Sequence, residues 1–254
     1  MRCMMKEAKV GSRREFAKQA MILSAAGILW QESKAFADDK KAISHEGGKP
    51  LVAKEHKAKP LHFKPNSLNG ISEKLIQSHW ENNYQGSVKN LNAVRGRLAE
   101  AMTVKDLPPF VYGGLKREHL MRNGSVILHE LYFDNLGGDG KYSGEIHKKI
   151  VQDFGSHDHW EAEFKRTAQS LAGGSGWVVL GYNVASASLE NYWLADHMHG
   201  PMGVMPILVL DMYEHAFQMD YGAAAAKYID AFFLNIHWLE LEKRWENAHK
   251  VQWA

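Results

Sequence analysis

One apolar run near the C-terminal end constrains this chain more than any other stretch. Residues 205–210 are short enough to form a buried strand, and the run ends on Asp211. Four residues later comes His215, with Glu214 beside it. A carboxylate at a strand end and an imidazole one helical turn further on can both reach a single metal ion. The alternative is a helix N-cap aspartate followed by an ordinary surface histidine.

Two long helical patterns precede this strand, separated by an Asp-Leu-Pro-Pro sequence. Ser72 is a suitable N-cap for a helix that continues through Val94, and residues 116–133 predict a second long helix. His79 lies on the apolar face of the earlier helix, and His129 lies in the later one. By itself, a histidine on an apolar helix face is more often a core residue than a ligand.

The second half of the chain mixes short strands with helices. After a glycine-rich junction, we expect helices at 145–154 and 159–171, strands at 177–182, 188–194 and 205–210, and a closing helix at 228–245. Three short strands among helices indicate an α+β fold. We therefore predict an N-terminal domain with a long helical hairpin, residues 61–138, and a mixed C-terminal domain, residues 139–254, with a three-stranded antiparallel sheet and helices.

The N-terminal segment has the order of an export signal. Residues 12–18 match the twin-arginine pattern, a modestly apolar run follows at 20–30, and Ala-Phe-Ala at 35–37 suits a signal peptidase. We predict a signal peptide over residues 1–37, a flexible linker over 38–60, and a periplasmic or secreted protein without a membrane anchor in its mature form. The alternative is an uncleaved amphipathic N-terminal helix.

The charge and the cysteine content limit which ligands the protein can bind and which side chains can hold a metal. The formal net charge of +2 owes much to residues 1–37, which hold seven Lys or Arg and three Asp or Glu, so no basic face for nucleic acid is implied. The only cysteine, Cys3, lies inside the predicted signal. Any metal in the mature chain must therefore be held by His, Asp or Glu.

Several motifs, taken in order, resemble one family. The sequence Asp-Met-Tyr-Glu-His-Ala at 211–216 resembles the D-x-W-E-H-A signature of the iron/manganese superoxide dismutases. The resemblance extends from about residue 59 to 245 and includes the segments at 90–92, 154–156 and 174–177. One such motif alone would be a weak signal, whereas several in the family's order are specific.

The resemblance implies a ligand set and a reaction. It assigns His79, His129, Asp211 and His215 to one iron or manganese ion per subunit. Three neutral imidazoles and one carboxylate suit either metal and leave a position open for water or substrate. The implied reaction converts superoxide, the small-molecule substrate, into oxygen and hydrogen peroxide.

The surroundings of the implied site depart from the family pattern. The usual gateway tyrosine is replaced by Ser87, and Tyr84 is the nearest phenol that could stand in for it. The solvent-binding glutamine of iron-type members is Ser125, and the alignment places His197, or else His199, at the manganese-type glutamine. We therefore predict His197, Tyr84 and Ser87 as the catalytic candidates beside the metal-bound solvent.

The resemblance also implies a homodimer or a dimer of dimers. In the family, the glutamate at the position of Glu214 forms a hydrogen bond with the last ligand histidine of the second subunit. That histidine corresponds to His215 in this chain. The residues that meet across the same interface are here the amides Asn83 and Gln218. Val209 is bulkier than the glycine usual in manganese-type members, which favours iron.

Two other functions remain open at this point. Ser87 and Asn83 interrupt the family's proton route, so the protein could bind metal with little or no activity. The His- and Met-containing stretch 197–205 is also typical of copper ligands, which predicts a periplasmic metal-handling protein.

Overall fold

The computed structural model of the protein describes residues 55–253. Ser72 caps the first α-helix of these residues. The Ser72 Oγ accepts a hydrogen bond from the Leu75 N–H at 3.1 Å and so satisfies one free donor of the first helical turn. The elements of the helical half are η2 (Pro65–Ser67), α2 (Glu73–Ser78), η3 (His79–Tyr84), α3 (Gln85–Ala101) and α4 (Pro109–Asp134). Because η3 is π-helical, the predicted helix from Ser72 through Val94 is confirmed with a local change of winding.

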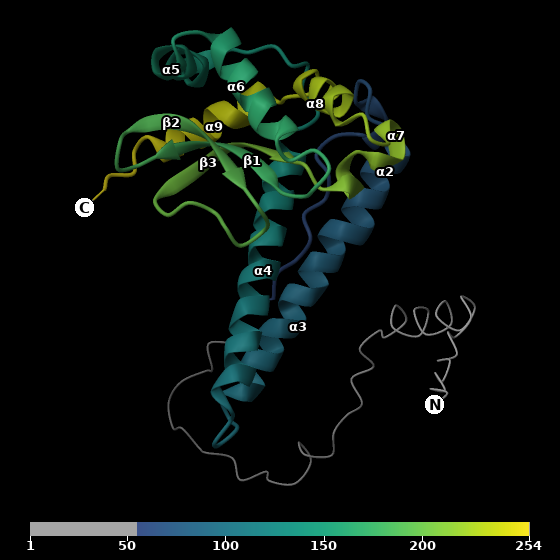
Figure 1. Cartoon of the computed structure of the whole chain (residues 1–254), viewed down its shortest axis with the longest axis vertical. Coiled ribbons are helices and arrows are strands. Elements are labelled where there is room, and N and C mark those ends of the chain that lie inside the picture. The colour runs from purple at the N-terminus through teal and green to yellow at the C-terminus, as the bar shows by residue number, and fades with distance from the viewer. Residues whose placement is uncertain (1–54, 254) are drawn as a thin grey trace, which may run out of the picture. The chain divides into compact units, whose positions relative to one another are not determined.

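Helix α4 begins at Pro109, earlier than the predicted start at residue 116. Proline is tolerated in the first helical turn because its missing N–H would have no intrahelical partner there. The Pro108-Pro109 pair therefore starts α4 as well as separating it from α3. The two helices pack against each other and extend as a hairpin away from the sheet (Figure 1).

Residues 55–60, which we predicted as the end of a flexible linker, are bound to this hairpin. His56 Nε2 lies 2.6 Å from Glu130 Oε1, and Lys59 Nζ lies 3.0 Å from Glu130 Oε2. The backbone N–H of His56 also donates to Asn92 Oδ1 at 2.9 Å. These bonds show that the linker prediction is wrong for residues 55–60, because charged partners on α4 attract them.

The predicted three-stranded antiparallel sheet is confirmed. It consists of β1 (Trp177–Asn183), β2 (Ser188–Leu194) and β3 (Val204–Asp211), in the order β2-β1-β3. The central strand β1 is almost entirely buried. Helix α6 packs against β1 and β2, while α4 and α9 pack against β3. Trp177 is the register partner of Asp211, so the start of β1 lies beside the end of β3.

The two helices predicted between the hairpin and the sheet are confirmed as α5 (Gly144–Phe154) and α6 (His157–Gln169). Gly155 ends α5 with a positive φ of 85°, which glycine adopts without strain. Ser156 then caps α6, because its side chain accepts a hydrogen bond from the His159 N–H at 3.1 Å.

The chain after the sheet differs from the prediction. The short elements η4 (Glu214–Ala216) and α7 (Gln218–Tyr221) are followed by α8 (Ala225–Phe233) and α9 (Trp238–Ala248), not by one helix over 228–245. The buried Asn235 lies in the break. Its side chain accepts from the Asn69 N–H at 2.7 Å and donates to the Asn69 carbonyl at 2.8 Å. These two bonds tie the break between α8 and α9 to Asn69, which lies 166 residues earlier in the chain.

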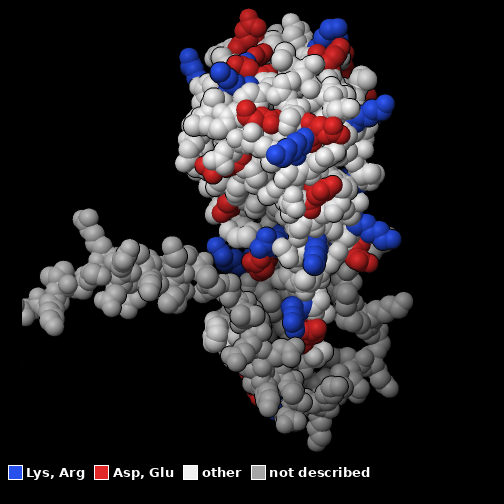
Figure 2. All heavy atoms as spheres, turned by 90° about the vertical axis from the view of Figure 1, so that its right-hand side faces the viewer, with Lys and Arg blue, Asp and Glu red and all other residues white. Residues whose placement is uncertain are grey.

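The α+β class is confirmed, and the hairpin and the mixed half share one apolar core. The boundary at residue 138 stays a prediction, as do the signal at 1–37 and the linker at 38–54, which lie outside the described residues. Within residues 55–253, no helix has the length and apolar character needed to cross a bilayer. On the face shown in Figure 2, acidic and basic side chains are interspersed.

Candidate metal centre

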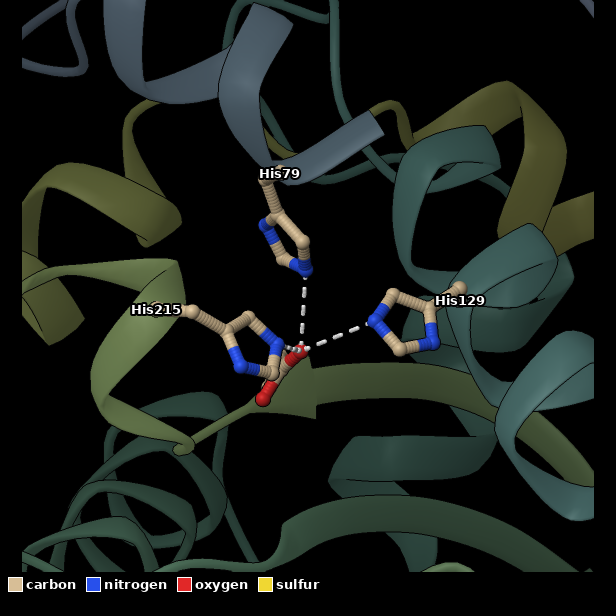
Figure 3. Close-up of side chains that lie close together, drawn as sticks. His79, His129 and His215 are labelled. Atoms are coloured by element: carbon tan, nitrogen blue, oxygen red, sulfur yellow. Dashed lines mark hydrogen bonds and ion pairs between the residues drawn. The ribbon is translucent and has the colours of Figure 1, made fainter. Parts of the chain in front are cut away.

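Four side chains from four separate elements meet at the end of β3. His79 begins η3, His129 lies in α4, Asp211 ends β3 and His215 lies in η4. Each offers one ligand atom, and these atoms all lie within 4.8 Å of one another. Figure 3 shows the three imidazoles directed at one carboxylate from different sides. The structure therefore brings together all four residues of the expected ligand set.

The distances define a common point near one carboxylate oxygen. Oδ2 of Asp211 lies 3.1 Å from His79 Nε2, 3.7 Å from His129 Nε2 and 3.2 Å from His215 Nε2. The other carboxylate oxygen, Oδ1, accepts a hydrogen bond from the Tyr213 N–H at 2.8 Å. That bond fixes the carboxylate so that a single oxygen faces the three imidazoles.

The hydrogen bonds around His129 select its metal-binding nitrogen. The Nδ1–H of His129 donates to the Ser125 carbonyl at 2.7 Å, which leaves a lone pair on Nε2. In the described residues, the buried Nε2 atoms of His79 and His129 have no hydrogen-bond partner. Buried polar atoms are normally paired, and a metal ion would satisfy both nitrogens. The donor set therefore fits a metal ion.

The electrostatics keep the ligands in their metal-binding forms. Burial lowers the pKa of His79, and burial together with the neighbouring His79 lowers the pKa of His129 to about 3. Burial alone would raise the pKa of Asp211, but His215 and His79 hold it well below its usual range. At neutral pH the site thus offers neutral imidazoles from His79 and His129 and one carboxylate, a set that suits iron or manganese.

A cavity of about 210 Å³ leads to these ligands. Its lining is mostly small and polar: Asn82, Asn83, Gly86, Ser87, Asn90, Arg122, Ser125, His129, His197 and His215. Ser87 Oγ and Ser125 Oγ are 2.8 Å apart, and Ser125 Oγ lies 3.3 Å from His129 Nδ1. Two of the predicted catalytic candidates, Ser87 and His197, therefore lie at this cavity.

His197, and not His199, is the histidine that faces the ligands. The Trp177 indole donates to His197 Nδ1 at 2.9 Å, and the His197 ring stacks on Tyr213 at 4.8 Å. His199 instead pairs with Asp196 and is mostly exposed. The two histidines of the stretch 197–205 thus have different surroundings, which gives no support to the copper-site interpretation.

The backbone of His197 lies unusually close to α4. A Cβ added at Gly124 would lie 1.8 Å from the His197 carbonyl oxygen. Only glycine at this position allows the loop to approach the helix so closely. Gly124 therefore positions His197 beside His129.

Tyr84 does not lie where the prediction placed it. Its buried hydroxyl donates to Glu130 Oε1 at 2.9 Å and accepts from the Lys59 N–H at 2.7 Å. Tyr84 is not part of the cavity lining. Burial raises the pKa of its phenol. The attraction of Glu130 for the hydroxyl explains why Tyr84 turns away from the cavity, and its position does not support a role beside bound solvent.

Sequence reasoning missed two contributors. Arg122 lines the cavity from α4, two helical turns before His129, and helical spacing would have placed both on one face. The Trp177 ring packs edge-on against His129 at 5.1 Å. No local signal could have revealed that contact, because it depends on the pairing of β1 with β3.

The fold and this site define a class: a mononuclear metalloprotein with a three-histidine, one-aspartate site between a helical hairpin and a three-stranded sheet. Residues 142–244 match the sequence family described as iron/manganese superoxide dismutases, C-terminal domain. The chain belongs to the iron/manganese superoxide dismutase family, as its relatives also show.

Three relatives carry this assignment. A protein named superoxide dismutase [Fe] from Cupriavidus metallidurans is 50% identical over 76% of this chain and 98% of its own length. Another of that name, from Aquifex pyrophilus, is 37% identical over 77% of this chain and 94% of its own. The Haloferax volcanii protein named superoxide dismutase [Mn] 1 is 33% identical over 76% of this chain and 96% of its own length.

Proposed function

We propose that this protein is a superoxide dismutase with one iron or manganese ion held by His79, His129, Asp211 and His215. The convergence of three imidazole nitrogens on one carboxylate oxygen carries the proposal. Membership of the family supports it, because the relatives reported above are named superoxide dismutases.

The bound ion would supply the redox chemistry, alternating between +2 and +3 as one superoxide is oxidised to oxygen and a second, with two protons, is reduced to hydrogen peroxide. The chain supplies the rest. The Asp211 carboxylate offsets part of the charge of the ion, and the Ser125 carbonyl orients His129. Because Trp177 donates to His197 Nδ1, the neutral His197 ring carries its proton on Nε2 and can donate it on the cavity side.

A reconstitution experiment tests the function. Mature protein is loaded separately with iron and with manganese, the metal per chain is measured, and superoxide decay is followed by stopped-flow absorbance. We expect one ion per chain and a decay rate far above that of the apoprotein with at least one metal. Full metal content with a decay rate equal to that of the apoprotein would instead establish a metal-binding homologue without activity.

We propose iron as the metal. The relatives from Cupriavidus metallidurans and Aquifex pyrophilus, named for iron, share 50% and 37% identity, and the Haloferax volcanii relative named for manganese shares 33%. The bulky Val209 before Asp211 favours the same metal. Activity with manganese but none with iron in the reconstitution would contradict the choice.

We propose that two copies share the site. His215 keeps 26% of its side chain exposed while the other three ligands are buried, and the neighbouring Glu214 is exposed. In the described residues, no group bonds to His215 Nδ1. A glutamate from a second copy would orient this imidazole and raise its basicity. Gln218 is exposed and Asn83 half-buried, as a shared interface near the cavity requires.

We also propose export through the twin-arginine route. The proposal rests on three segments in the order of an export signal: the twin-arginine pattern at 12–18, the apolar run at 20–30 and the cleavage site at 35–37. The physical advantage of this route is that it lets the protein select its metal in the cytoplasm. This route carries folded protein, so the metal would be bound before exposure to copper and zinc, which bind such sites more tightly. Changing Arg13 and Arg14 to Lys should leave metal-loaded protein in the cytoplasm, measured by cell fractionation; unchanged export would contradict the route.

A further inference from the structure

The cavity that leads to the ligands contains one permanent positive charge. Its lining consists of serine, asparagine and glycine residues, the histidines, and Arg122. No carboxylate and no lysine is among these described lining residues. Arg122 is therefore the one lining side chain, among the described residues, that carries a permanent positive charge.

Arg122 occupies the outer end of the cavity wall. It lies on α4 two helical turns before His129, or about 10 Å along the helix axis, with Ser125 between them. His129 and Ser125 are 1% and 2% exposed, whereas 31% of the Arg122 side chain is exposed. Along α4, exposure thus rises from His129 toward Arg122, and Arg122 marks the mouth of the cavity on the α4 side.

A second residue holds the guanidinium in this position. Arg122 Nε donates to Glu118 Oε1 at 2.7 Å, and Glu118 lies one turn further from the ligands and outside the cavity lining. Guanidinium has five N–H donors, and the bond to Glu118 uses one. The remaining donors have no partner among the described residues. They remain free to meet an anion that enters the cavity.

We propose that Arg122 is the anion-receiving residue of this metal centre: its guanidinium draws superoxide into the mouth and binds it on the way to the ligands. The inference rests on the proposed function and adds the residue that recognises the substrate charge. A single positive charge in a cleft with low-dielectric walls concentrates a small anion there. Arg122 and His129 are separated by about 10 Å along the helix axis, a length comparable with the Debye length at physiological salt, so we expect added salt to weaken this attraction.

Three variants on one helix test the proposal. Arg122→Gln removes the charge, Arg122→Lys keeps it, and Arg117→Gln removes an exposed charge of α4 that does not line the cavity. Each full-length mature protein is loaded with metal, and its metal content and melting temperature are measured. We then compare kcat/KM for superoxide at ionic strengths from 0.01 to 0.5 M, roughly the range over which screening becomes severe.

We expect Arg122→Gln to lower kcat/KM about three- to tenfold at the lowest salt and to converge with the unmodified protein at the highest. Arg122→Lys should keep more than half of kcat/KM, and Arg117→Gln should match the unmodified protein. Glu118→Gln should raise kcat/KM at low salt, because it removes the negative charge that partly offsets the guanidinium. Equal losses in Arg122→Lys and Arg122→Gln, or equal values for Arg122→Gln and Arg117→Gln, would overturn the proposal.

Azide binding separates this inference from the dismutase activity. The dissociation constant of azide for the metal-loaded protein, followed by absorbance, needs no turnover. Arg122→Gln should raise this constant several-fold, and Arg117→Gln should not change it. If the unmodified protein lacks dismutase activity, the proposed function fails, while the azide titration still decides whether Arg122 receives anions. An unchanged azide constant in Arg122→Gln overturns the inference even in an active enzyme.

Discussion

The Trp177 indole N–H donates to His197 Nδ1 across 2.9 Å, and this bond fixes the proton of the neutral imidazole on Nε2. The His197 ring lies 6.0 Å from the ring of His129. Trp177 itself starts β1 opposite Asp211, so the sheet register that delivers the carboxylate also delivers the group that orients His197.

Replacing Trp177 by Phe should therefore lower activity without emptying the site. The aromatic packing is largely kept, but His197 loses its fixed tautomer, and we expect the rate to fall about 10- to 100-fold with the metal content unchanged. The measurement is metal analysis beside superoxide decay. His199→Ala is the matched control, because His199 lies outside the cavity. A fully active Trp177→Phe variant would refute the orienting role.

Replacing His129 by Ala should abolish metal binding and lower stability. The ion connects α4 to η3, β3 and η4, and its binding free energy contributes to folding only when the ligand set is complete. We expect less than one tenth of the normal metal content and the loss of the increase in melting temperature that metal gives the unmodified protein. Full metal content in this variant would remove His129 from the site.

Replacing Glu214 by Ala should weaken the dimer and reduce metal occupancy together. If the glutamate accepts a bond from His215 of the partner subunit, its loss leaves a buried imidazole N–H unpaired, at a cost of about 1–3 kcal/mol. Sedimentation at several concentrations and metal analysis measure the two effects. Glu246→Ala, at another exposed glutamate, is the control. A variant that stays dimeric with full metal contradicts the shared site.

Acid should destabilise the apoprotein well before its carboxylates titrate. The pKa values of His79 and His129 in the folded protein lie below 6.5, so below that pH the unfolded chain binds protons that the folded chain does not. For His129 the unfolding free energy falls by about 1.4 kcal/mol per pH unit between pH 6.5 and about 3, and His79 adds a loss in the same direction.

Protonation of Asp211 lowers the unfolding free energy of the apoprotein further at lower pH. Its folded pKa lies below the usual 3.8, so its contribution is present above that value and disappears as the pH falls further. Urea unfolding of the apoprotein at pH 7.5, 6.0 and 5.0 measures the histidine contribution, and His129→Gln should show a shallower dependence. An unfolding free energy that does not change between pH 7.5 and 5.0 would be inconsistent with neutral buried histidines.

Local patterns explain why so much of the ligand set could be predicted. The apolar run that ends on Asp211 becomes β3, and the following turn carries His215, because a strand ending and a turn are set by a few adjacent residues. His79 and His129 lie on helices whose caps and periodicity are also local. Their role as ligands came from the family resemblance, since spacing alone does not distinguish a core histidine from a ligand.

The surroundings of the ligands could not be predicted in this way. Tyr84 follows His79 by one π-helical stretch, and only the folded hairpin shows that its hydroxyl bonds to Glu130. His56 was predicted as part of a linker, yet it pairs with the same Glu130, 74 residues further along the chain. Both outcomes depend on which surfaces pack together.

The sequence by itself thus determined the strand, the long helices and the order of the metal-binding residues, because hydrophobic periodicity and capping act over a few residues. Tertiary structure alone decided that His197 and not His199 faces the site, that Ser87 pairs with Ser125, and that Arg122 stands at the cavity mouth. These contacts join residues distant in the chain, and their geometry follows from how the hairpin packs against the sheet, which no local pattern encodes.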